Sequence, residues 1–350
     1  MTRYTTTDVL ICGAGVTGLT LAIELARHGV SFRLIEKRTT PFIGSRGKGI
    51  QPRTQEIFED LGILNKVVAA GGLYPRLRTY RHDGSYVDSD IAHHTKPTHA
   101  EPYHLPLMVP QNVTETIMRE QLKAWGHRVE FGCELRHFAQ TPRTVTAYVA
   151  GPAGEEVIIA HYLIGADGGG SFVRKKLGVS FPGRTLGIHA LVADASLSGL
   201  NRDVWRGIKR ERDVQQLDIQ YTNSPLAHTL PERQHGLQAG ERAPDAPLLG
   251  AGGQSLRLFQ LLQGPDWNLL AYETHGKVID ARRGLRIHHI GEQDELIDTL
   301  GHFRESYHLA PGQCVLIRPD GYVGAFFHGK QSNDIENYLS RFAIGIKDEY

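Results

Sequence analysis

Cysteine is scarce in this sequence. The 350 residues contain three cysteines, Cys12, Cys133 and Cys314, which are far apart and form no CxxC pair. Such isolated thiols indicate a reduced protein of the cell interior, not a secreted one stabilised by disulfides. Cys12 lies in an apolar run and is expected to pack there. Cys314 is interpreted as a strand residue rather than a nucleophile, because a dithiol motif is missing.

An excess of charge of either sign is missing too. The formal net charge is +1, which gives no reason to expect nucleic acid or an acidic membrane surface as a partner. No basic-then-apolar leader precedes Val9, and no apolar run approaches membrane-spanning length. We therefore expect a cytoplasmic protein with no nucleic-acid partner and no membrane partner.

Compact catalytic and metal-binding spacings are also missing. The 18 histidines are scattered, and the four between residues 91 and 104 lack the short ligand spacing of zinc sites. We interpret that segment as a polar loop over a pocket, with a metal site as the less favoured alternative. The sequence also places no Ser-His-Asp set and no pair of carboxylates at a convincing spacing. We therefore expect no resident metal.

The strongest positive signal lies in residues 8–36, which predict a strand, a glycine turn, a helix and a second strand. The turn reads Gly13-x-Gly15-x-x-Gly18. In such a turn the glycines allow a tight bend, leave room for a pyrophosphate and let the helix lie close to the strand. The helix start offers free N–H groups and a positive dipole end to phosphates. Glu36 ends the second strand, where a carboxylate can accept both hydroxyls of an adenosine ribose.

This unit predicts a dinucleotide-binding site, because the glycine motif stands between a strand and a helix and the acidic residue is in place. A glycine-rich turn in some other parallel sheet is the less favoured alternative. The motif alone does not separate FAD from NAD. The cofactor-binding residues expected here are Gly13, Gly15, Val16, Thr17, Gly18, Glu36 and Lys37.

Two polar residues further along could also reach a ligand. Arg46 lies in a basic, glycine-rich loop and could contact a pyrophosphate or be a solvated charge. Gln111 stands just ahead of a helix expected from 112 to 125, so its amide could bond a ligand or merely cap the helix. In that helix Glu115 and Arg119 are expected to pair outward. Its inward face should contain Val113, Ile117 and Leu122.

A second glycine-rich turn follows an apolar strand that ends near Gly165. The turn contains Asp167 and Gly168 and leads into a helix with Val173 and Arg174. A strand end again meets a helix start, so N–H donors and an acceptor converge where a cofactor can lie. We therefore expect Asp167 and Gly168 in the same site as the first turn.

Taken together, these pieces resemble the class A flavoprotein monooxygenases, the single-component FAD and NAD(P)H aromatic hydroxylases that act on phenols, resorcinols and polyketides. The resemblance covers about residues 8–195 and includes Pro52-Arg53-Thr54 after the Arg46 loop and Ser171-x-Val173-Arg174 after the second turn. It implies that Glu36 binds the adenosine ribose and that Arg46 and Gln111 contact FAD. It also implies that Asp167 and Gly168 serve both FAD and the pyridine nucleotide.

The resemblance implies an FAD-dependent monooxygenase that uses NADPH or NADH and O2 to hydroxylate a phenolic or polyketide-type aromatic substrate. The catalytic residues are unknown at this stage. An alternative is a non-catalytic flavin- or nucleotide-binding accessory protein that completes its site with a partner. A third, less favoured reading is an NAD-dependent dehydrogenase that uses the first β-α-β unit for NAD.

The sequence departs from the resembled family in its middle. The family's third flavin motif is Gly-Asp followed by Ala and His, and this chain contains no Gly-Asp dipeptide. We infer that a long segment is absent between about Arg206 and Gln215. That segment would carry the substrate roof, so we expect weaker flavin binding and little coupled hydroxylation from the chain as written.

The expected fold is α/β in three parts. Residues 1–190 should form a Rossmann-like FAD-binding domain, a parallel sheet with hairpin insertions, and residues 191–216 a truncated substrate-domain remnant and junction. Residues 217–350 resemble a thioredoxin-like domain with a structural role or a homodimer surface. Its expected elements are strands at 267–272, 285–290, 315–317 and 322–327 and helices at 292–303 and 331–342.

Overall fold

The computed structural model describes residues 3–44, 47–74, 77–81, 83–90, 96–183, 216–228, 233, 235–274, 276–292, 294–342 and 344. The chain divides into two compact units. The first comprises Met1–Gly49, Asn65–Gly72 and Met108–Arg202, and the second comprises Ile50–Leu64, Leu73–Leu107 and Asp203–Tyr350. The expected division at residues 190 and 217 stays a prediction, because almost all of the segment between them lies outside the described residues.

The first unit is built on a six-stranded sheet with the order β8-β2-β1-β11-β10-β9. Strands β8, β2, β1 and β11 run parallel, and β11, β10 and β9 form an antiparallel meander. The parallel part brings the carboxyl ends of β1, β2 and β11 to one edge of the sheet. The strands are β1 (Arg3–Cys12), β2 (Phe32–Glu36), β8 (Val129–Phe131), β9 (Glu134–Gln140), β10 (Val145–Gly151) and β11 (Gly154–Gly165).

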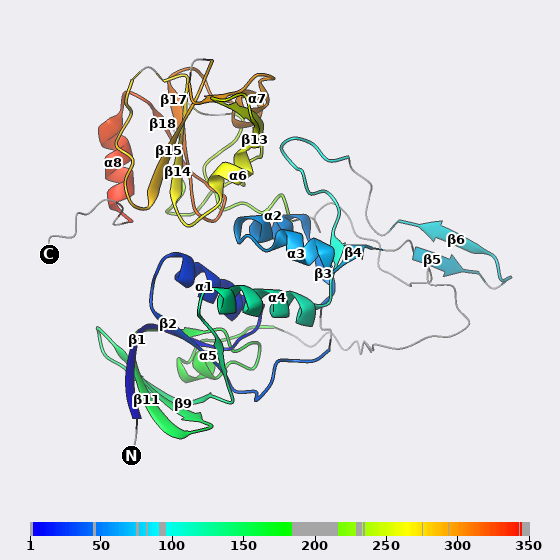
Figure 1. Ribbon diagram of the computed structural model, residues 1–350, viewed down its shortest axis with the longest axis vertical. Coiled ribbons are helices and arrows are strands. Elements are labelled where there is room, and N and C mark those ends of the chain that lie inside the picture. Colours follow the sequence, from blue (N-terminus) through cyan, green and yellow to red (C-terminus); the bar gives the residue numbers. More distant parts are fainter. Residues whose placement is uncertain are drawn as a thin grey trace. The chain divides into compact units, whose positions relative to one another are not determined.

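Helices cover both faces of this sheet. Alternation along β1 directs Leu10 and Cys12 into a core that also contains Val173 of α5 (Phe172–Lys176). The opposite face carries α1 (Val16–Arg27), the connection between β1 and β2. Helix α4 (Gln111–Ala124) lies alongside α1 (Figure 1). This arrangement confirms the expected Rossmann-like layering.

The second unit contains a seven-stranded mixed sheet with the order β13-β12-β16-β15-β14-β17-β18. Strand β14 is parallel to β15 and antiparallel to β17, which pairs antiparallel with β18. The elements are β12 (Pro247–Gly250), β13 (Ser255–Arg257), α6 (Leu258–Leu262), β14 (Trp267–Tyr272), β15 (Leu285–Ile290), β16 (Leu296–Ile297), α7 (His302–Tyr307), β17 (Gln313–Ile317), β18 (Val323–His328) and α8 (Ser332–Ser340).

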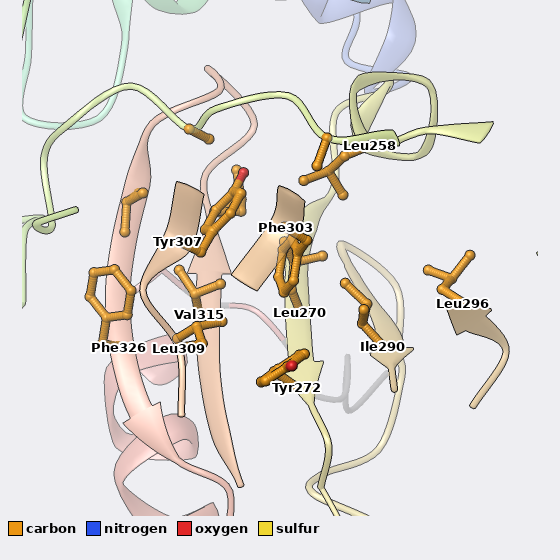
Figure 2. Close-up of a cluster of buried hydrophobic side chains, with 14 of the residues drawn as sticks. Leu258, Leu270, Tyr272, Ile290, Leu296, Phe303, Tyr307, Leu309, Val315 and Phe326 are labelled. Carbon is orange, nitrogen blue, oxygen red and sulfur yellow. The ribbon is translucent and has the colours of Figure 1, made fainter. Parts of the chain in front are cut away.

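A separate core lies on each face of this sheet. Figure 2 shows the first core, where Phe303 and Tyr307 of α7 lie against Leu270, Val315 and Phe326 from three strands. The rings of Phe303 and Tyr307 stack with centroids 4.6 Å apart. The second core contains α8 residues and the opposite faces of the same strands. A mixed sheet covered by helices on both faces is the arrangement expected of the thioredoxin-like part.

The remaining elements are short and lie in the sequence between β2 and α4. Strands β5 and β6 pair antiparallel and form a hairpin. The short elements are β3 (Gly49–Ile50), α2 (Pro52–Asp60), α3 (Leu64–Ala69), β4 (Gly72–Leu73), β5 (Leu77–Tyr80), β6 (Tyr86–Ser89) and β7 (Leu107–Met108).

Among the described residues, no helix has both the length and the apolar character needed to cross a membrane.

One expected helix is wrong. The segment 292–303 contains the short strand β16, and α7 begins only at His302. Strand β16 pairs with β15, and a local cap sets the start of α7, because the Asp298 carboxylate accepts the backbone N–H groups of Phe303 and Arg304 at 3.2 and 3.0 Å. A carboxylate that bonds these first-turn donors starts a helix after itself, not before.

Candidate functional site

A cavity of about 560 Å³ opens in the first unit at the carboxyl edge of the parallel strands. Its wall comes from the turn after β1, the end of β2, the start of α4 and the turn after β11. Its volume is in the usual range for cofactor sites. The expected residues that line it are Gly13, Gly15, Val16, Thr17, Glu36, Lys37, Gln111, Asp167 and Gly168.

Two glycines of the first turn are required by the protein itself. Gly13 has φ +104°, and a Cβ there would collide with the carbonyl oxygen of Ala166. A Cβ on Gly18 would collide with the carbonyl oxygen of Gly13. Gly18 therefore allows close packing of helix and strand, as expected, although it is not part of the cavity wall.

Gly15 is different, because no protein atom would prevent a side chain at this position. Its φ of −77° is open to any residue, and no heavy atom lies within 4 Å of the position a Cβ would take. Since Gly15 lines the cavity, a side chain there would occupy ligand space. This is the pattern expected where a backbone must approach a pyrophosphate.

The amino terminus of α1 opens at the same place. Gly15 is the N-cap residue and supplies no side-chain acceptor, and the first turn of α1 carries no acidic residue. The first N–H groups of a helix have no intrahelical partner, and together they attract an anion. The cavity thus offers phosphate-binding donors where Gly15 leaves room.

Glu36 is held with hydrogen-bonding capacity to spare. Its Oε2 accepts the Ala14 N–H at 3.0 Å and its Oε1 accepts the Arg38 N–H at 3.0 Å. A carboxylate has about four acceptor positions, so each oxygen can take one further donor. The geometry fits a carboxylate that accepts two vicinal hydroxyls of a ribose.

Asp167 organises the second turn. Its carboxylate accepts the Ser171 hydroxyl at 2.5 Å and the N–H groups of Phe172 and Val173 at 2.6 and 3.2 Å. These bonds start α5 and hold the glycine run Gly168–Gly170 along the cavity wall. Cβ atoms on these three glycines would meet no protein atom within 4 Å. The first and second turns therefore face one space, as the sequence predicts.

Helix α4 contributes a charged face to the cavity, whereas the sequence predicts this face on the outside of the protein. Glu115 is 4% exposed and lines the cavity together with Gln111 and Arg119. The predicted pair exists, with 3.8 Å between Arg119 Nη1 and Glu115 Oε2, but it faces the cavity and not solvent. An i,i+4 pair of opposite charges resembles a surface pair in sequence, so only the fold reveals it.

The cysteines are poor nucleophiles. Burial, with a smaller effect of Asp167, raises the pKa of Cys12 to about 12, and burial raises that of Cys314 to about 12. Burial also raises the pKa of Cys133, which lines the cavity without any signal in the sequence. The thiol form dominates at neutral pH in each case, which agrees with packing roles for Cys12 and Cys314.

Some expected site residues lie outside the described residues. Arg46 is one, and His93 and His94 of the histidine-containing segment are others. The ring of His99 is tilted against the ring of His302, with the ring centroids 4.1 Å apart. No group of three or more His, Cys, Asp or Glu side chains with metal-binding geometry occurs in the described part of the chain.

A comparison with protein families finds one match, the family described as FAD binding domain, over residues 6–212. Among curated proteins, a flavin-dependent monooxygenase of Mycobacteroides abscessus is 38% identical over 211 residues, 59% of this chain and 44% of the relative. The 6-methylpretetramide 4-monooxygenase of Streptomyces rimosus is 34% identical over 222 residues, 63% of this chain and 36% of the relative. The matched region thus spans less than half the length of these curated relatives.

Solved structures share the fold at low sequence identity. The flavin-dependent monooxygenase PieE, solved with FAD and substrate, has a TM-score of 0.77 at 15% identity and covers 96% of this chain and 98% of its own. Aklavinone-11 hydroxylase, solved with FAD and aklavinone, has a TM-score of 0.74 at 18% identity, with 97% and 99% covered. At these identities the likeness concerns the fold.

Proposed function

Since the chain belongs to the FAD binding domain family, among the class A FAD-dependent aromatic hydroxylases, we propose that it binds FAD in the cavity of the first unit and serves an aromatic monooxygenase reaction. The reaction uses NADPH or NADH and O2, and the substrate is a phenolic or polyketide-type aromatic compound. The observation that carries the proposal is the convergence of Glu36, the α1 amino terminus and the Asp167 turn on one cavity.

Different residues of the cavity bind different parts of FAD. Glu36 accepts the adenosine ribose hydroxyls, and the α1 amino terminus receives the pyrophosphate over Gly15. Gln111 and Gly168 contact the flavin half, and Arg46 in the adjoining loop is proposed to contact FAD as well. Bound FAD supplies the activation of oxygen, while the protein orients the cofactor and limits access of water.

The names of the relatives support the substrate class. The Streptomyces rimosus relative is a 6-methylpretetramide 4-monooxygenase, and the crystal structure of aklavinone-11 hydroxylase contains FAD and aklavinone. A polycyclic phenol is therefore the first substrate to assay. We further propose a cytoplasmic location and a homodimer.

The segment inferred to be absent between about Arg206 and Gln215 favours a second candidate, a non-catalytic flavin- or nucleotide-binding accessory protein. The specific observation is the missing Gly-Asp dipeptide of the third flavin motif. If the chain alone oxidises NADPH faster when a phenol is added, the accessory role is rejected.

The test of FAD binding needs only the purified chain. Denaturation should release FAD with its yellow absorbance in close to equimolar amount after reconstitution with excess cofactor. Glu36→Ala should bind FAD about tenfold more weakly, because two hydroxyl contacts to a charged acceptor are lost. Release of NAD instead of flavin would support the dehydrogenase reading and reject the proposal.

A further inference from the structure

Three polar side chains form a row along α4. Gln111, Glu115 and Arg119 are spaced by four residues, so they share one face of the helix, and all three line the cavity. Glu115 is the most deeply buried of them at 4% exposure. A buried carboxylate is costly unless it is paired and hydrogen-bonded, so its partners indicate what it does.

Glu115 has one partner on each side. Its Oε1 accepts a hydrogen bond from Gln111 Nε2 at 2.7 Å, and its Oε2 lies 3.8 Å from Arg119 Nη1. Arg119 is anchored in turn, because its Nη2 donates to Thr116 Oγ1 at 2.7 Å. The carboxylate is thus held between a fixed cation and the Gln111 amide.

This pairing determines which way the Gln111 amide points. A carboxylate only accepts hydrogen bonds, so the amide NH2 must face Glu115 and the carbonyl oxygen must face away from it. The backbone of Gln111 is fixed as well, since its N–H donates to the Gly47 carbonyl at 2.9 Å. The Gln111 Oε1 atom lies on the Gly47 side, 3.7 Å from the position of a Cβ there.

We propose that Glu115 is a positioning residue that fixes the Gln111 amide so that Gln111 presents an acceptor to the ligand. The inference rests on the proposed FAD binding and makes it more specific. An oxygen acceptor cannot bond an ionised phosphate oxygen, so Gln111 Oε1 contacts an O–H or N–H donor of the ligand. In FAD these donors are the hydroxyls of the ribose and of the polyol chain and the N–H groups of the two ring systems.

The test is a double-mutant cycle in FAD affinity, measured by titrating apo-protein with FAD and following flavin fluorescence. Glu115→Leu and Gln111→Ala should each weaken binding about tenfold, because each removes one oriented hydrogen bond to the ligand. The double variant should bind no more weakly than Gln111→Ala, because Glu115 acts through Gln111. Glu115→Gln keeps an acceptor oxygen for the amide and should bind within about twofold of wild type.

The matched control is Glu120→Leu, which makes the same chemical change at an exposed position of α4 and should leave FAD affinity unchanged. Thermal unfolding of each apo-variant shows whether it is folded, and Glu115→Met replaces Glu115→Leu if the latter is not. Multiplying effects in the double variant, or loss of binding in Glu115→Gln, would overturn this inference alone. Failure of the wild-type chain to bind FAD would overturn the proposed function and this inference with it.

Discussion

The glycines of the first turn differ in whether the fold or a bound ligand requires them. Gly13 and Gly18 are required by nearby carbonyl oxygens, whereas Gly15 has open space where a side chain would stand. A glycine without a structural reason, at the wall of a cavity, is best explained by what enters the cavity. The same holds for Gly169 and Gly170, whereas Gly168 has φ +79°, a backbone conformation that itself favours glycine.

The variants Gly15→Ala and Gly13→Ala test this distinction as a matched pair. Gly15→Ala should change the free energy of unfolding by less than about 0.5 kcal/mol and weaken FAD binding about tenfold or more, because the methyl group fills ligand space. Gly13→Ala should destabilise the apo-protein by about 2 kcal/mol or more, because of its positive φ and the clash with Ala166. Urea unfolding and FAD titration measure the two effects. Equal stability losses for both variants would contradict the assignment.

At the residue level, the sequence predicts that the first turn and Glu36 meet at one place, because glycine spacing and strand ends carry that information directly, and both line the cavity. It does not predict that Glu115 faces the cavity, because an i,i+4 acid–base pair has the same pattern on a surface and in a binding site. Cys133 carries no signal either, since its place depends on strands that are far apart in the sequence.

Among the elements, α2 is joined to the rest of the second unit by buried charges. Glu56 accepts hydrogen bonds from Arg53 at 2.7 Å and from Arg242 at 2.9 Å, and all three residues are buried. Arg53 also donates to the Asp320 carbonyl at 2.7 Å. The motif Pro52-Arg53-Thr54, which resembles the hydroxylase family, therefore acts here in folding.

Removal of one charged partner should lower the free energy of unfolding, because a buried charge then loses part of its compensation. Arg242→Met leaves Glu56 with a single cation and should lower the free energy of unfolding by about 3–5 kcal/mol. The control Arg136→Met removes a pair with Glu134 whose side chains are 63% and 42% exposed, and it should cost less than about 1 kcal/mol. Chemical denaturation measures the loss of unfolding free energy in both variants. Similar losses would show that the buried network contributes no more to stability than the exposed pair.

A second charged cluster joins the strands of the first sheet. Arg33 on β2 donates to Glu130 on β8 and to Glu156 on β11 at 2.5–2.9 Å. The hydrogen bond from Arg33 lowers the pKa of Glu156 below its ordinary value of 4.5. A depressed folded-state pKa means that the stabilisation is complete above pH 4.5 and is lost as the pH falls below it.

The free energy of unfolding of Glu156→Gln should therefore differ less between pH 6 and pH 3 than that of the wild-type protein does. The variant should be less stable than wild type at pH 6, and the gap should shrink as Glu156 protonates in the wild-type protein. Chemical denaturation of the apo-protein at several pH values measures this. A gap that stays constant across the range would mean that the Arg33 cluster does not discriminate the ionised form.

For the elements, the sequence predicts strand limits well where a strand is short and bounded by turns. The limits of β14 and β15 are as predicted, although β15 contains an arginine and two histidines. The helix expected at 292–303 fails because β16 pairs with β15 at Ile290 and Leu296, a tertiary contact that periodicity does not contain. The Asp298 cap then determines where α7 starts.

For the whole molecule, the first unit contains the cavity proposed to bind FAD and the second contains its own two cores. The sequence predicts both fold classes, since each unit has a clear order of strands and helices. It does not predict that Ile50–Leu64 and Leu73–Leu107 group with the second unit, because that grouping depends on buried contacts such as those of Glu56.

The proposed missing middle segment has a consequence for turnover. Without the substrate roof, NADPH oxidation by the chain should yield mostly hydrogen peroxide and little hydroxylated product, because water reaches the flavin. Product and peroxide are quantified in one assay with a polycyclic phenol. If product formation matches NADPH consumption, the proposed gap has no functional effect.

The central claim is that the two glycine turns of the first unit hold one FAD molecule between them. A crystal structure of the chain with FAD tests it most directly. We predict the adenosine ribose hydroxyls within about 3 Å of the Glu36 carboxylate and the pyrophosphate over Gly15 at the start of α1. FAD bound elsewhere, with Glu36 and the Asp167 turn both free of it, would contradict the account.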